Sequence, residues 1–138
     1  MDVKDKIKVI PFILENKFEK CKSLECGFAN GYVAIPPTNK DWGKFYDNID
    51  ANIHGGLTYS EPYLKREYLK SKNKPFNKDN RERCLYGKPI YLTLNNEIPD
   101  DWWVVGFDTF HCGDNKATCD INFCISETLK LAEQLSKE

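Results

Sequence analysis

The chain contains two histidines, His54 and His111, and each stands beside glycine and close to carboxylates. His54 lies in the segment DANIHGGLTYS, and His111 lies in GFDTFHCGD. Imidazole and carboxylate groups are metal ligands and acid–base catalysts, and neighbouring glycines let a ligand or a backbone segment approach closely. If the two segments end neighbouring strands, both imidazoles can reach one pocket.

The spacing around His111 suggests divalent-metal binding. Asp108, His111 and Asp114 recur at three-residue intervals. A turn can therefore direct their oxygen and nitrogen atoms at one ion, with His54 as a fourth ligand. The pattern matches no local metalloenzyme signature, such as two histidines flanking a glutamate on a helix. In the simpler interpretation, the aspartates accept backbone N–H bonds in a tight turn and His111 packs or pairs with one of them.

Aromatic residues near these polar groups suggest a second chemistry, recognition of a planar ligand such as a nucleobase. Aromatic faces stack on bases, while His, Thr and Asp side chains hydrogen bond to the base edges. Such a pocket would be lined by His54, Gly55, Gly56, Thr58, Tyr59, Trp102, Asp108, His111 and Asp114. The alternative place for the aromatic residues is the core, above all for Trp103 and Phe107, which share one strand face.

Six cysteines are many for a chain of 138 residues. They are Cys21, Cys26, Cys84, Cys112, Cys119 and Cys124. The N-terminal apolar run is short and broken by Pro11, so we expect no signal peptide and a cytosolic protein with reduced thiols. The paired C-x-x-C spacing of zinc ribbons is missing, which favours buried, inert thiols over a structural zinc site. A nucleophilic pair of Cys112 and His111 is disfavoured because chain neighbours usually point apart.

Length and composition predict a single soluble domain spanning residues 1–138. The chain is 41% hydrophobic and 30% charged with a net charge of -1, which argues against a sequence-specific nucleic-acid binder. No segment is long enough to span a membrane. Residues 65–83 carry eight Lys/Arg against three acids, whereas residues 95–120 carry six acids against one Lys. We therefore expect an exposed basic insertion at 62–86, whose charge could attract a phosphate.

Several β-rich segments must position these groups. Apolar runs and alternation predict strands within 6–15, 32–35, 49–54, 57–59, 88–94 and 102–108. Pro11 suggests that the first is an edge strand, Asn30-Gly31 reads as a hairpin turn, and Gly55-Gly56 breaks the third. WWVVGFD is apolar on both faces and predicts a central strand. Between the second and third strands we expect a loop with one helical turn, capped by Thr38 or Asn39.

The C-terminal segment SETLKLAEQLSK predicts an amphipathic helix. Ser126 is a candidate N-cap, and Leu129, Ala132 and Leu135 recur at helical spacing. Combined with the strands, the helix predicts an α+β fold. It consists of a mainly antiparallel sheet of about five strands, with the C-terminal amphipathic helix packed on one face.

Three ordered motifs resemble a family of small, mostly uncharacterised bacteriophage and prophage proteins. The motifs are GYVAIPP, WGKFYDNIDANIHGGLTYSE and WWVVGFDTFHCGD, and they cover residues 31–60 and 102–114, about a third of the chain. The family's motif positions correspond here to His54, Gly55, Gly56, Thr58, Tyr59, Gly106, Asp108, His111, Gly113 and Asp114. Cys112 stands where many relatives carry a small residue, which weakens the case for a role of that thiol.

The resemblance and the residues together leave three functions open. Small phage proteins include sponges that trap cyclic-nucleotide immune signals, as well as nucleases, hydrolases and inhibitors of host enzymes. We expect first a homo-oligomeric anti-defence protein of the host cytoplasm, which sequesters a nucleotide-derived ligand without a cofactor and without turnover. The alternative is a metal-dependent hydrolase of a phosphodiester or nucleotide, with His54, Asp108, His111 and Asp114 as ligands. The third is an inhibitor that contacts a host protein directly.

Overall fold

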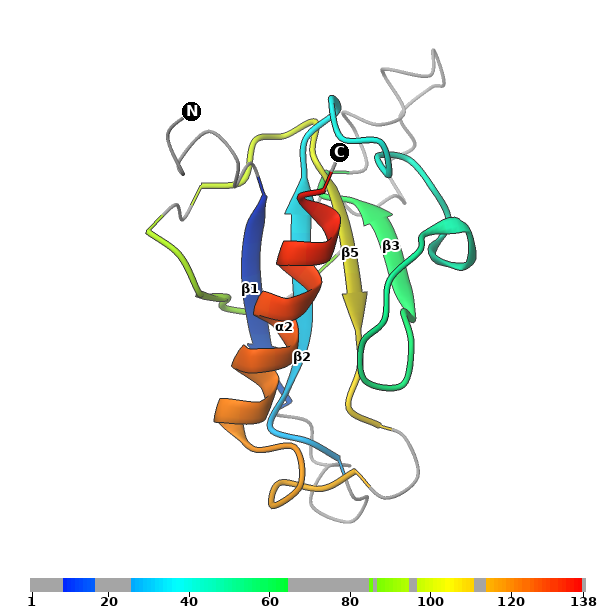
Figure 1. Ribbon diagram of the computed structural model, residues 1–138. Coiled ribbons are helices and arrows are strands. Elements are labelled where there is room, and N and C mark those ends of the chain that lie inside the picture. Colours follow the sequence, from blue (N-terminus) through cyan, green and yellow to red (C-terminus); the bar gives the residue numbers. More distant parts are fainter. Residues whose placement is uncertain are drawn as a thin grey trace, which may run out of the picture.

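The computed structural model describes residues 9–16, 26–64, 85, 87–94, 97–110 and 114–137. Within these residues, five strands form one antiparallel sheet in the order β3-β5-β2-β1-β4, with helix α2 across one face (Figure 1). The elements are β1 (Ile10–Glu15), β2 (Ala29–Ile35), η3 (Tyr46–Asn48), β3 (Tyr59–Pro62), β4 (Ile90–Tyr91), β5 (Trp103–Phe107) and α2 (Ile121–Leu135). This arrangement confirms the predicted α+β fold. No helix among the described residues is both long and apolar enough to cross a membrane.

The two faces of the sheet carry different side chains because strand residues alternate between them. On the helix face, alternate residues of β2 and β5 form a core with α2: Val33, Ile35, Trp103, Val105, Phe107, Leu131 and Leu135. The opposite face, which we name the aromatic face, carries Phe12, Tyr32, Tyr59, Tyr91 and Trp102 around small aliphatic residues. All five residues of β5 are buried, as predicted for a central strand.

Asn30 and Gly31 do not form the predicted hairpin turn, because both lie inside β2. Gly31 pairs with Ile13 of β1 and with Phe107 of β5. A Cβ atom at Gly31 would lie 2.2 Å from Thr128 Oγ1 of α2 and 2.5 Å from the Phe107 ring. Glycine is present here because the helix packs directly on the strand, so its role is close approach rather than chain reversal.

The connection between β2 and β3 contains no strand at 49–54, contrary to the alternation of its residues. Ile49 and Ile53 are buried in the helix-face core, which accounts for the alternation. The main chain of Asn52 pairs with a side chain instead of a strand: its N–H donates to Gln134 Oε1 at 2.6 Å, and Gln134 Nε2 donates to its carbonyl at 2.9 Å. The Gln134 side-chain amide therefore forms the two main-chain hydrogen bonds with Asn52 that a neighbouring strand would otherwise form.

The same connection packs on β5 through a pair of indoles. The Trp42 and Trp103 rings lie 6.0 Å apart between centroids, tilted by 53°. Trp42 Nε1 donates to the Asp101 carbonyl at 2.9 Å, and Trp103 Nε1 donates to the Lys44 carbonyl at 3.2 Å. The 3-10 turn of this connection, η3, starts after Phe45 with no side-chain cap, so neither Thr38 nor Asn39 caps it. Asn39 instead caps an earlier turn, where its Oδ1 accepts from Asp41 N at 2.9 Å and its carbonyl accepts from Trp42 N at 3.1 Å.

Three further boundaries differ from the sequence prediction. Helix α2 begins five residues before Ser126, and its N-cap is Asp120, whose side chain accepts from Phe123 N at 2.8 Å. Strand β1 is not an edge strand, because the two-residue β4 pairs with it at Phe12 and Ile13. The predicted insertion at 62–86 falls largely outside the described residues, but its first residue, Pro62, closes β3.

Candidate metal centre

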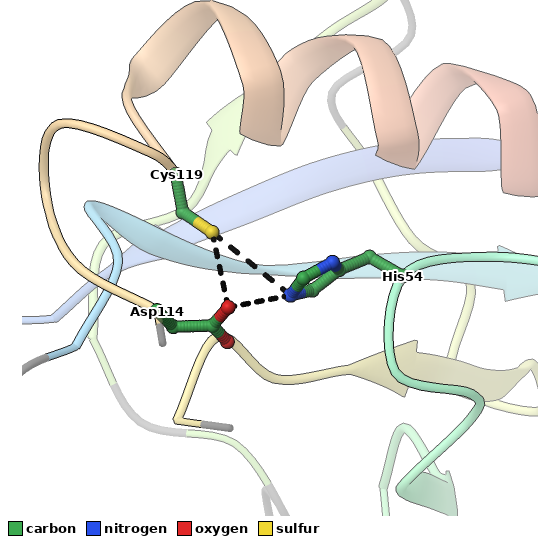
Figure 2. Close-up of side chains that lie close together, drawn as sticks. All are labelled: His54, Asp114 and Cys119. Atoms are coloured by element: carbon green, nitrogen blue, oxygen red, sulfur yellow. Dashed lines mark hydrogen bonds and ion pairs between the residues drawn. The ribbon is translucent and has the colours of Figure 1, made fainter. Parts of the chain in front are cut away.

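Three side chains from two connections converge at one end of the sheet. His54 comes from the β2–β3 connection, while Asp114 and Cys119 come from the loop between β5 and α2 (Figure 2). His54 Nε2 lies 2.8 Å from Asp114 Oδ1, Cys119 Sγ lies 3.5 Å from the same oxygen, and Sγ lies 3.9 Å from Nε2. We name this group the His54–Asp114–Cys119 triad.

The loop that carries Asp114 and Cys119 is fixed by its own hydrogen bonds. Asn115 Oδ1 accepts from Ala117 N at 2.8 Å and from Thr118 N at 2.9 Å, an Asx-type turn. Cys119 N donates to the Asn115 carbonyl, and the Cys119 carbonyl accepts from Phe28 N, both at 2.8 Å. Two residues five positions apart in sequence are thereby held side by side, immediately before α2.

Two residues of α2 position His54. Its backbone N–H donates to Glu127 Oε1 at 2.8 Å, and its ring stands edge-on against Phe123 with centroids 5.1 Å apart. Gly55 and Gly56 follow with φ of 68° and 80°, values in the left-handed region that glycine adopts without strain. The predicted break at these glycines is therefore a turn that returns the chain towards β3.

Asp114 and Cys119 are buried, whereas the His54 side chain is partly exposed to solvent. The side chain of Asp114 is 5% exposed and that of His54 is 27% exposed, while Cys119 is 1% exposed. Burial, the hydrogen bond to Asp114 and the charge of that carboxylate together raise the pKa of the Cys119 thiol to about 11. Without a cation in the triad, the thiol therefore stays protonated and donates to the carboxylate.

The geometry of the triad differs from that of a catalytic site with a nucleophilic cysteine. In a Cys–His–Asp relay the thiol and the carboxylate contact different ring nitrogens, so that a proton can pass through the imidazole. Here both approach Nε2, and the thiol is buried. Three donor atoms that converge on one point suit an ion rather than a proton relay.

The observed separations are close to those of a metal site. Tetrahedral zinc places nitrogen and oxygen ligands about 3.3 Å apart and each of them about 3.5 Å from sulfur. The triad shows 2.8 Å between nitrogen and oxygen, 3.5 Å between oxygen and sulfur, and 3.9 Å between nitrogen and sulfur. Movements of about half an ångström would convert the hydrogen-bonded triad into a coordination sphere.

Asp108, Tyr59 and Trp102, also predicted as site residues, lie apart from the triad. Asp108 accepts from Phe110 N at 3.1 Å, and its charge adds to burial in raising the pKa of Tyr32 on the aromatic face, against a hydrogen bond from Asn30 that lowers it. Tyr59 packs edge-on against Tyr32, with centroids 5.4 Å apart, and Trp102 also packs on the aromatic face. The structure thus brings His54 and Asp114 together and places Asp108, Tyr59 and Trp102 apart from them.

Of the other predicted positions, one forms a main-chain hydrogen bond beside β5 and others lie outside the described residues. Thr58 is half-buried, and its N–H donates to the Gly106 carbonyl at 3.0 Å beside β5. The predicted ligand His111, with Cys112 and Gly113, lies outside the described residues. Cys26 and Cys124 are buried, as predicted, and form no disulfide among the described residues.

Cys119 is the functional residue that the sequence interpretation missed. The sequence places it among the buried thiols, because no C-x-x-C pair surrounds it. The available signal was the segment DNKATCD, in which turn-forming residues separate Asp114 from Cys119 and can fold the two together. A thiol, a carboxylate and an imidazole form a mixed donor set that spacing rules for zinc ribbons do not detect.

No protein-family model, curated protein or solved structure matches this chain. The resemblance to phage proteins, and with it the host-cytoplasmic location and homo-oligomeric state, stays a prediction. The function therefore has to be argued from the triad.

Proposed function

We propose that the protein is a metal-dependent hydrolase of a phosphodiester or nucleotide, with the triad holding a zinc-class ion. One observation carries the proposal: the ligand atoms of His54, Asp114 and Cys119 all lie within 4.8 Å of one another. The ligand atoms indicate the class of ion, because a thiolate beside an imidazole favours zinc and its neighbours in the transition series over magnesium or calcium.

Among the described residues the site has three protein ligands, and its imidazole is partly open, which fits a catalytic rather than a structural site. Structural zinc sites are closed by four protein ligands, whereas catalytic sites keep one position for water. A zinc ion held by His54, Asp114 and Cys119 would lower the pKa of such a water to near neutral. In the hydrolysis, the water oxygen would form a bond to phosphorus as the bond from phosphorus to the leaving oxygen breaks, the water would lose a proton to solvent, and the leaving oxygen would take one up.

The charge of the chain supports a phosphate substrate. Residues 65–83 carry a local charge of +5, from eight basic and three acidic residues, in a protein whose net charge is -1. Clustered Lys and Arg side chains attract phosphate groups through charge-assisted hydrogen bonds.

The described residues favour hydrolysis over ligand capture. A nucleotide-binding pocket needs stacking rings and hydrogen-bonding groups side by side. Tyr59 and Trp102 pack on the aromatic face, whereas the ring of His54 contacts Phe123 of α2. The first function expected from the sequence would require residues from both faces to act on one ligand.

Metal content, binding and turnover test the proposal. Elemental analysis of the purified wild-type chain should find one zinc-class ion per chain. Cys119→Ala should weaken Co²⁺ binding by more than about 100-fold, because it removes a ligand. Cys26→Ala, which removes an equally buried thiol outside the triad, should bind Co²⁺ like the wild type.

The substrates are bis(p-nitrophenyl) phosphate and a panel of cyclic dinucleotides, with products separated by chromatography. The loaded protein should cleave a phosphodiester, and His54→Ala should abolish cleavage. A wild-type chain that takes up no ion rejects the metal site. A loaded chain that returns every dinucleotide intact rejects the hydrolase, and stoichiometric retention of one of them would favour ligand capture.

A further inference from the structure

We infer that Glu127 is a positioning residue for His54, and that its carboxylate determines how tightly the triad binds its ion. The inference rests on the proposed metal site and concerns a residue that no motif identified. It follows from the hydrogen bonds that α2 side chains form with the main chain around His54.

Two side chains of α2 hold the segment 52–54. Gln134 donates to and accepts from the main chain of Asn52, and Glu127 accepts from the N–H of His54. The two residues are seven positions apart, which is about two helical turns and places them on the same side of the helix. Between these contacts, Ile53 is buried in the helix-face core. The segment is thus fixed on both sides of a buried anchor.

The two contacts act on different parts of the segment. The Gln134 amide satisfies Asn52, two residues before the ligand, whereas the Glu127 carboxylate contacts the ligand residue itself. A hydrogen bond from a backbone N–H to a carboxylate is charge-assisted, which generally makes it stronger than one to a neutral acceptor. Glu127 therefore determines the position of the His54 main chain from which the imidazole extends.

The same helix also orients the His54 ring. Phe123 lies one turn before Glu127 on α2 and contacts the edge-on imidazole. Residues at i and i+4 share a helix face, so one stripe of α2 holds both the main chain and the ring of His54. Cys119 lies directly before the helix N-cap, Asp120. Two of the three triad residues are thus positioned relative to one rigid element, a condition for tight metal binding.

The experiment compares Co²⁺ affinities, measured from the visible absorption of the bound ion, in the full chain. Glu127→Ala should weaken Co²⁺ binding about 10- to 100-fold, the usual range when an outer-shell partner is removed. Glu127→Gln keeps an acceptor oxygen and should bind within about threefold of the wild type. Gln134→Ala, the matched control, removes two hydrogen bonds to the same segment and should also stay within about threefold.

Thermal unfolding of the metal-free variants separates positioning from stability. Glu127→Ala and Gln134→Ala should lower the melting temperature by similar amounts, while only the former weakens Co²⁺ binding. If Glu127→Ala does not fold, the pair Glu127→Gln and Glu127→Met makes the same comparison, since the two are similar in size and only Gln has an acceptor oxygen.

Each outcome decides a different question. The positioning role is wrong if Glu127→Ala, or Glu127→Met in its place, binds Co²⁺ as tightly as the wild type. It is also wrong if Gln134→Ala weakens binding equally. A wild-type chain that binds no Co²⁺ overturns the metal site itself.

Discussion

The Cys119 thiol, a ligand in the proposed metal site, is protonated in the metal-free chain. Its only polar surroundings in the triad are a carboxylate and an imidazole nitrogen, and it lies in contact with both. A cation placed between them would favour the thiolate, so metal binding should release a proton and tighten with rising pH.

The raised pKa of Cys119 predicts a loss of stability in alkali. The folded metal-free chain holds the thiol proton up to a pH of about 11, whereas an unperturbed thiol releases it near 9.0. Between these values the unfolded state binds fewer protons, so the free energy of unfolding falls as pH rises, and the contribution is intact below 9.0. Burial also raises the pKa of Cys124 and Tyr32, which act in the same direction.

Urea unfolding across this pH range provides the measurement. The free energy of unfolding should decline less steeply in Cys119→Ser than in the metal-free wild type. Parallel declines in the two proteins would show that the thiol does not titrate as described.

At the residue scale, the sequence identified two of the three triad members. His54 and Asp114 stand in glycine-containing motifs at predicted strand ends, where function often concentrates. Only spacing groups Asp108 with them, and strand alternation opposes this grouping: Phe107 faces the helix side, so the next residue faces the other. Cys119 could not be assigned, because its contacts depend on a tertiary arrangement of loops rather than on spacing.

At the scale of elements, the contact between α2 and the sheet depends on Gly31. Gly31→Ala should destabilise the protein by about 1–3 kcal/mol, the usual cost of overpacking a core. The added Cβ would meet Thr128 Oγ1 at 2.2 Å. Chemical unfolding measures the loss, and Gly31→Ala combined with Thr128→Ala should cost less than the sum of the single variants. Strict additivity would show that the two residues do not meet.

The sequence predicted most of the strands and the helix, but not all that satisfies their backbones. Long apolar runs identified β1, β2 and β5, because burial requires such residues. Alternation at 49–54 correctly marked Ile49 and Ile53 as buried, yet no strand forms, since Gln134 supplies the hydrogen bonds of a missing neighbour. The hydrophobic pattern predicts which side chains are buried, but it does not predict which groups form hydrogen bonds with the main chain.

At the scale of the whole molecule, the triad joins parts of the chain that are far apart in sequence. His54 and Asp114 are separated by 60 positions and meet only when the β2–β3 connection packs beside the β5–α2 loop. The unfolded chain therefore lacks the complete site, and binding should be linked to folding.

Zinc should accordingly raise the thermal stability of the wild-type chain. At a free concentration 100 times the dissociation constant, one site that exists only in the folded state adds about 2.7 kcal/mol. Differential scanning fluorimetry should show an upward shift that a chelator reverses. Asp114→Asn, compared with and without zinc, should show little of that shift. An equal shift in this variant would mean that zinc acts elsewhere.

The indole pair of Trp42 and Trp103 has a consequence for spectroscopy. Two aromatic chromophores 6.0 Å apart and tilted by 53° couple their electronic transitions, which produces paired bands of opposite sign in circular dichroism. One indole belongs to the connection that carries His54 and the other to β5. The chain therefore contains an intrinsic optical reporter of whether that connection is seated on the sheet, readable without any label.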